Sequence, residues 1–124
     1  MIEISPMIIL PDFNAYEFNC PCCGLNNMKP VFLWQLQQCR TEAQIPFIIT
    51  SGTRCKKHNK IVGGRSSSEH LTGEAVDILV KNSNERFKIV KSAIETGFNR
   101  IGIGRDFVHI GGSNGAPQQV VWIY

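Results

Sequence analysis

The sequence predicts an α+β fold, a small central antiparallel sheet with helices packed on one side. Two segments, 29–43 and 85–97, carry apolar residues at helical spacing. Several short runs, among them 75–80 and 107–110, alternate in the manner of strands and are rich in branched residues. The chain has 124 residues, of which 43% are hydrophobic. This is the size of one domain with one core, so we expect a single domain over 1–124.

The N-terminal half predicts a lead-in, a helix and a strand. Residues 1–28 contain cysteines and are expected to be irregular or briefly helical. Pro30 occupies a first-turn position of the helix over 29–43, where its missing N–H costs nothing. The strand 46–50 follows, and a loop with a short helix then ends at the glycine pair 63–64.

The C-terminal half predicts one more helix and the remaining strands. Residues 82–84 can cap the helix over 85–97, and Gly97 stops it. The residues expected on its apolar face are Phe87, Val90 and Ile94. Three short strands close the chain, over residues 100–104, 107–110 and 120–124.

Charge and the first residues limit the classes of partner. The net charge of +3 comes from scattered Lys and Arg, which is too mild to indicate nucleic acid binding but suits an anionic polymer. The start MIEISPMIILPDF has no basic segment before its short apolar run, and proline follows that run. Neither a signal peptide nor a membrane span is therefore expected. We expect a soluble monomer without nucleic acid or membrane partners.

Polar residues inside strands indicate where the chemistry lies. His70 and Asp77 are seven residues apart in SSSEHLTGEAVDILV, and Thr72 with Gly73 predicts a turn that can return His70 toward Asp77. Asp77 lies in an otherwise apolar strand, and His109 does the same in DFVHI. A buried charge needs a partner. Two strands of one sheet could place Asp77 beside His109, with His70 as the third member.

Two imidazoles and one carboxylate are the ligands of a catalytic zinc site, because they leave a fourth tetrahedral position for water. Zinc lowers the pKa of such a water toward neutrality. We expect Asp106 in the turn at Gly104 and Arg105, from which it can reach over the metal as a general base. Arg54 follows an apolar strand in SGTR. Each residue also has a plainer interpretation, a hydrogen-bonded core histidine or a surface ion pair, but their conjunction favours a site.

The five cysteines fall into two groups. Cys39 lies in the first helix at core spacing and is expected to be packing. Cys20, Cys22, Cys23 and Cys55 could form a disulfide in an oxidising compartment, hold a second, structural zinc, or remain free thiols. Read as C-x-C-C, the run CPCC departs from the C-x2-C spacing of most structural zinc sites. A disulfide to Cys55 is therefore favoured over zinc.

Two segments carry a resemblance to a known family. ITSGTRCKKHNKIVGGRSSSEHLTGEAVDI and GIGRDFVHI together resemble the zinc D-Ala-D-Ala carboxypeptidase family, the hedgehog-type murein peptidases, and above all its small single-domain members. The likeness covers about residues 45–112. It implies the α+β fold of that family and hydrolysis of peptide bonds in peptidoglycan stems. Matched residue by residue, it assigns the zinc ligands to His70, Asp77 and His109, the base to Asp106, and the arginine that steadies substrate and oxyanion to Arg54.

The resemblance leaves some residues and functions open. Glu69 departs from the small or polar residue that many relatives have before the histidine. Glu69 and Glu74 are expected to be solvated or to support the ligands, and His58 is expected outside the ligand set. The rival functions are a non-catalytic zinc module of the same fold and an interaction domain with a cysteine-bound zinc. The implied substrate places the action at the cell wall, in the periplasm or outside the cell, with phage delivery as one route.

Overall fold

The architecture centres on a five-stranded sheet. The computed structural model describes residues 2–5 and 8–124. The strands lie in the order β3-β4-β6-β5-β7, and all neighbours are antiparallel except β5 and β7, which are parallel. The predicted α+β class is confirmed, with this parallel edge pair as a refinement. The strand bounds are β3 Ile49–Ser51, β4 Ala75–Leu79, β5 Arg100–Ile103, β6 Phe107–Gly111 and β7 Val120–Ile123.

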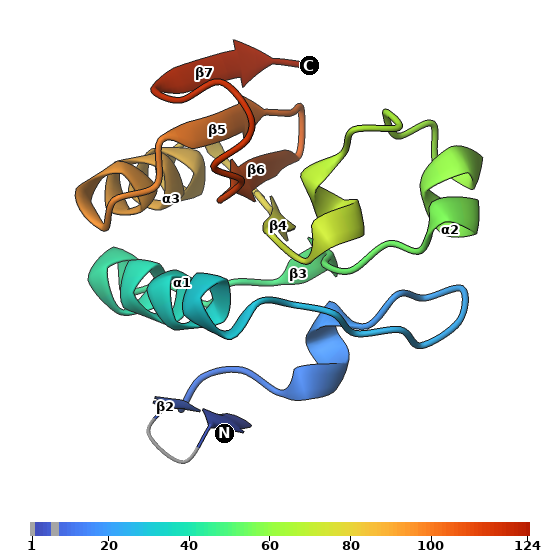
Figure 1. Ribbon diagram of the computed structural model, residues 1–124. Coiled ribbons are helices and arrows are strands. Elements are labelled where there is room, and N and C mark those ends of the chain that lie inside the picture. Colours follow the sequence, from blue (N-terminus) through green and yellow to red (C-terminus); the bar gives the residue numbers. More distant parts are fainter. Residues whose placement is uncertain (1, 6–7) are drawn as a thin grey trace.

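Two helices, α1 (Pro30–Ala43) and α3 (Ser83–Glu95), pack side by side on one face of this sheet (Figure 1). The first helix begins at Pro30 as predicted, and Cys39 is fully buried in it. Alternate residues of β4 and β6 point into the same hydrophobic core, among them Ile78 and Ile110. The opposite face of these two strands is therefore free to carry polar residues.

The exposed face of α3 differs from the prediction. Asn82 caps the helix by accepting a hydrogen bond from the Glu85 N–H at 2.9 Å, as expected. However, Phe87 and Ile94 are 63% and 55% exposed, whereas Ile89 on another face is buried. The predicted apolar face is confirmed at Val90, which packs against the core, and is wrong at Phe87 and Ile94. Packing against α1 and the sheet instead selects the stripe that contains Ile89.

The remaining elements are short, and the strand β2 (Ile8–Leu10) contacts α1. A short hairpin of β1 (Ile2–Ser5) and β2 (Ile8–Leu10), which the sequence did not predict, precedes the 3-10 turn η1 (Ala15–Phe18) in the lead-in. The short helix α2 (Lys56–Ile61) stands apart from α1 and α3 and contacts the 3-10 turn η2 (Glu69–Thr72).

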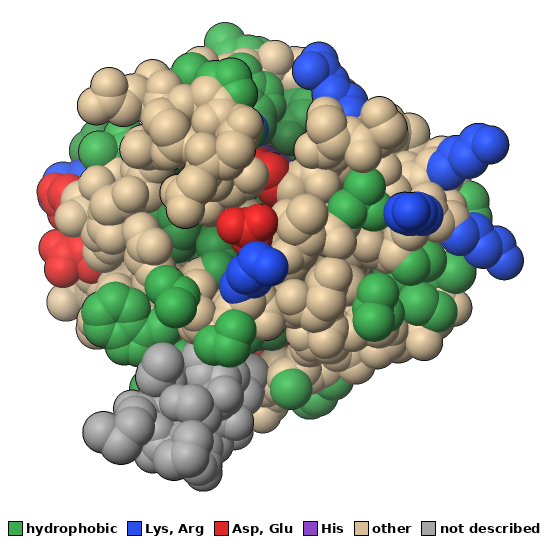
Figure 2. Space-filling model, in the orientation of Figure 1, with side chains coloured by type: hydrophobic (Ala, Val, Ile, Leu, Met, Phe, Trp, Pro, Cys, Tyr) green, Lys and Arg blue, Asp and Glu red, His purple; other side chains and the backbone are tan. Residues whose placement is uncertain are grey.

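Several basic side chains are exposed in and after α2. On the face in Figure 2, Lys and Arg gather mainly at the side where α2 lies. The exposed basic residues of this segment are Lys56, Lys57, Lys60 and Arg65. Within the described residues, no helix is long and apolar enough to cross a membrane.

Candidate metal centre

His70 comes from η2, directly before β4. The Ser68 side chain caps this turn by accepting a hydrogen bond from the His70 N–H at 3.3 Å. The imidazole is 2% exposed, and its Nδ1 is 2.8 Å from the Gly52 carbonyl. A carbonyl only accepts, so Nδ1 carries the proton and Nε2 presents a lone pair. Within the described part of the chain, this buried Nε2 has no hydrogen-bond partner.

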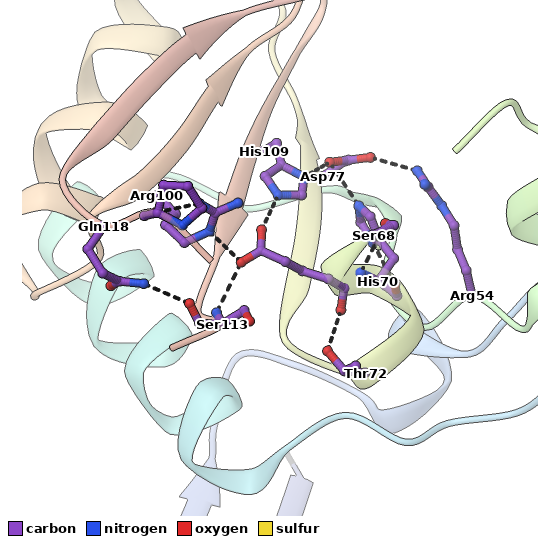
Figure 3. A network of polar contacts seen from close by, with 12 residues as sticks. Arg54, Ser68, His70, Thr72, Asp77, Arg100, His109, Ser113 and Gln118 are labelled. Carbon is purple, nitrogen blue, oxygen red and sulfur yellow. Dashed lines mark hydrogen bonds and ion pairs between the residues drawn. The ribbon is translucent and has the colours of Figure 1, made fainter. Parts of the chain in front are cut away.

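Asp77 and His109 lie directly opposite each other on β4 and β6. The predicted side-by-side placement is thus found in the strand register. Asp77 Oδ1 is 2.9 Å from His109 Nδ1 and 3.3 Å from His70 Nε2. Figure 3 shows both rings directed at the Asp77 carboxylate. Burial raises the pKa of Asp77, but the hydrogen bond from His109 Nδ1 and the His70 imidazole beside the carboxylate outweigh it and hold the pKa well below its usual value.

These three donors fit a zinc ion. Zinc ligands at about 2.0–2.2 Å in tetrahedral geometry lie roughly 3.4 Å apart, and the three donor atoms here lie within 4.8 Å of one another. The orphaned His70 Nε2 is the kind of atom that a metal satisfies. Each ring also has its far nitrogen occupied, by the Gly52 carbonyl and the Glu69 carboxylate respectively. This arrangement fixes the tautomer of a metal-bound histidine.

Glu69 is buried and contacts His109, so of the two expected alternatives it supports a ligand and is not solvated. Its Oε2 lies 3.0 Å from His109 Nε2, and its Oε1 accepts hydrogen bonds from Arg100 Nε at 2.7 Å and the Ser113 N–H at 3.0 Å. Burial raises the pKa of Glu69, but these partners lower it to about 2. A Cβ built at Gly111 would lie 2.0 Å from Glu69 Oε2, so only glycine leaves room for this carboxylate.

His109 lies between two carboxylates as a result. Its burial lowers the pKa, but the hydrogen bonds with Asp77 and Glu69 raise it above its ordinary value. A metal ion held by His109 Nδ1 would take the place of the proton that this environment favours, while Nε2–H would stay bonded to Glu69. Glu69 therefore belongs to the group of residues that support the ligands.

Arg54 reaches the other oxygen of the same aspartate. Its Nη2 lies 3.3 Å from Asp77 Oδ2 (Figure 3). Its Nε and Nη1 donate to Ser51 Oγ at 3.1 Å and to Asn59 Oδ1 at 3.3 Å. The side chain is only 15% exposed. A surface ion pair is therefore excluded, and the guanidinium sits at the edge of the ligand set.

Asp106 lies in the turn between β5 and β6, as predicted. The Gly104 N–H donates to the Phe107 carbonyl at 2.9 Å to close this turn, and the Asp106 carbonyl accepts from the Val80 N–H at 2.8 Å. The Asp106 side chain is exposed. His109 is three residues further along the strand, about 10 Å at the usual rise. The assignment of Asp106 as the base stays a prediction.

Comparison with known families agrees with this geometry. Residues 12–111 match the model of the family described as Peptidase M15. The chain belongs to the Peptidase M15 family. No curated protein gave a match. The family consists of zinc-dependent peptidases that act on peptidoglycan, and the His70, Asp77 and His109 cluster is one of two groups among the described residues that could hold a metal ion.

An aromatic wall, which the sequence analysis missed, borders the centre of this M15 chain. The Trp122 ring lies 5.3 Å from the His109 ring and 5.3 Å from the Arg100 guanidinium, and the Tyr124 ring lies 5.0 Å from that of Phe107. Trp122 and Tyr124 reach the site because β7 pairs with β5 at the edge of the sheet. The only signal in the sequence was the aromatic pair in VVWIY.

The N-terminal cysteines of the M15 chain lie near one another but outside this centre. Cys20, Cys23 and Cys55 form a second cluster with thiol sulfurs within 4.8 Å. All five cysteines carry free thiols in this structure, and the disulfide favoured from the sequence stays a prediction. His58 sits in the first turn of α2, and its N–H donates to the Cys55 sulfur at 3.4 Å.

Proposed function

We propose that this protein is a zinc metallopeptidase that hydrolyses peptide bonds in peptidoglycan stem peptides, as a D-Ala-D-Ala carboxypeptidase or a murein endopeptidase. The observation that best supports this proposal is that His70 Nε2, His109 Nδ1 and Asp77 Oδ1 lie close enough together to bind one metal ion. Membership of the Peptidase M15 family supports the reaction class.

The metal and the side chains have separate roles in this proposal. Zinc held by His70, Asp77 and His109 supplies Lewis-acid chemistry and a nucleophile at neutral pH. Asp106 takes the proton from the attacking water and later passes it to the leaving amine. Asp106 is exposed in a tight turn, so its side chain is free to change orientation. We expect its carboxylate to turn toward the attacking water when the substrate binds.

Arg54 is proposed to hold the substrate. Its planar donors can grip the carbonyl oxygen or a terminal carboxylate at two points, which a lysine cannot do. The contact with Asp77 Oδ2 orients the guanidinium beside the ligand set. The aromatic rings of Trp122 and Tyr124 lie beside the His109 ring. We expect them to exclude water from this side of the metal centre.

The test digests purified peptidoglycan with the zinc-loaded protein and identifies the fragments by mass spectrometry. We expect release of D-alanine or cleaved cross-links, loss of activity after mild chelation with most of the fold retained, and recovery with zinc. A His109→Ala variant is the matched inactive control. Hydrolysis by the metal-free protein would contradict a zinc mechanism. Tight zinc binding without cleavage of any wall peptide would instead indicate a non-catalytic zinc module.

A further inference from the structure

The second sulfur cluster joins two distant parts of the chain. Cys20 and Cys23 lie in the turn after η1, and Cys55 is the N-cap of α2. The sulfurs of these three residues all lie within 4.8 Å of one another. Cys20 is 1% exposed, whereas Cys23 is exposed at the surface. The cluster thus opens to solvent on one side, where an ion can enter.

The backbone around the cluster is folded so that N–H groups point at sulfur. The Cys55 N–H donates to Cys20 Sγ at 3.5 Å, and the His58 N–H donates to Cys55 Sγ at 3.4 Å. The turn itself is closed by hydrogen bonds from Gly24 N–H to the Cys20 carbonyl at 2.8 Å and from Cys20 N–H to the Leu25 carbonyl at 2.7 Å. Gly24 has a φ of +77°, which glycine adopts without strain.

The structure also corrects the spacing argument from the sequence. The residues that meet Cys55 are Cys20 and Cys23, and the two are separated by two residues. Their spacing is therefore the C-x2-C of many structural zinc sites, not C-x-C-C. In the sequence this spacing is not evident, because a third cysteine, Cys22, lies between the two.

We propose that Cys20, Cys23 and Cys55 bind a second, structural zinc ion, with Cys22 at the fourth position. Cys22 lies beside Cys23 in the same exposed turn, so we expect its thiol to close the set from the exposed side. A tetrahedral Zn–S site with bonds of about 2.3 Å places its sulfurs roughly 3.8 Å apart, which matches a cluster of this size. A disulfide joins only two sulfurs at about 2.05 Å and would leave the others of the cluster unpaired.

This ion would cross-link the N-terminal lead-in, through Cys20 and Cys23, to Cys55, which directly follows the residues that contact His70 and Asp77. The Thr53 N–H donates to the Phe18 carbonyl at 2.8 Å, and a Cβ at Gly52 would lie 2.8 Å from Phe18 backbone atoms. The same short segment carries the Gly52 carbonyl that holds His70 and the Arg54 that reaches Asp77. A structural zinc at Cys55 would therefore limit the movement of both contacts.

The experiment counts zinc in the full chain by elemental analysis and then adds an organomercurial, which takes thiolate ligands but not imidazole. We expect two zinc ions per chain, of which the mercurial releases one. Cobalt substitution provides a second measurement on the unmodified sequence, because only thiolate ligands give a sulfur-to-cobalt charge-transfer band. One zinc per chain that the mercurial leaves in place, or an intact mass lower by two hydrogens after protection from air, would overturn the proposal.

Variants assign the ligands. Cys23→Ser should lose one zinc and the charge-transfer band, while Cys39→Ala, which changes a cysteine buried far from the cluster in sequence, should keep both ions. Circular dichroism checks that both variants are folded. Zinc content of two in folded Cys23→Ser would refute the site. These counts do not depend on hydrolysis, so they are independent of the proposed peptidase function.

Discussion

Replacement of Glu69 by glutamine tests whether a buried carboxylate outside the ligand set controls zinc binding. Glu69 accepts hydrogen bonds from Arg100, Ser113 and His109. The glutamine oxygen can still face Arg100 and Ser113, which both donate, so its NH2 must face His109 Nε2. Nε2 then has to accept, and the ring proton moves to Nδ1, the nitrogen that faces Asp77. A protonated Nδ1 cannot bind metal.

The magnitude follows from this change of tautomer. Loss of a partner that orients a metal-bound histidine lowers metal affinity about 10- to 100-fold, which corresponds to about 1.4 to 2.7 kcal/mol. Competition with a chromogenic chelator should show this shift in one zinc-binding step of Glu69→Gln. Glu74→Gln is the matched control, because Glu74 is close in sequence and only half-buried.

A second readout separates this role from a general loss of stability. Nitrogen NMR of the zinc form should show His109 metallated at Nδ1 and protonated at Nε2 in the wild type, with this pattern disturbed in Glu69→Gln. Wild-type zinc affinity together with an unchanged ring pattern in Glu69→Gln would refute the reasoning.

Three further predictions concern catalysis and acid stability. Asp106→Asn should keep its zinc but lower turnover by about two to four orders of magnitude; full activity would remove Asp106 from the mechanism, and loss of zinc would make it a ligand. Arg54→Lys should slow cleavage of a D-Ala-D-Ala peptide with a free carboxylate far more than that of its carboxamide, with zinc content unchanged; equal slowing would indicate a structural role only. The pKa of Glu69 falls from 4.5 to about 2 on folding, so its contribution to stability, about 3 kcal/mol, is complete above pH 4.5 and is lost as the pH falls toward 2. Urea unfolding of the chelated protein should show this loss in the wild type and not in Glu69→Gln, and parallel pH profiles would contradict it.

The sequence by itself determined where the two long helices begin and how the candidate ligands are spaced. Pro30 and Asn82 mark helix starts through local backbone chemistry, and both lie where predicted. The alternation in AVDIL and FVHI separated Asp77 from Val76 and Ile78, and His109 from Val108 and Ile110, because side chains of a strand alternate by geometry alone. Such signals act within a few residues, so one sequence is enough to find them.

Only the tertiary structure decided the contacts that depend on distant partners. Glu69 became a buried support for His109 because Arg100 and Ser113, 31 and 44 residues away, neutralise and hydrogen-bond its carboxylate while Gly111 leaves room for it. The pairing of Cys20 and Cys23 with Cys55 likewise depends on the packing of the lead-in against a later loop. Burial of a charge or a thiol is a property of its surroundings. These surroundings come from residues far apart in the chain, so a local sequence pattern does not predict them.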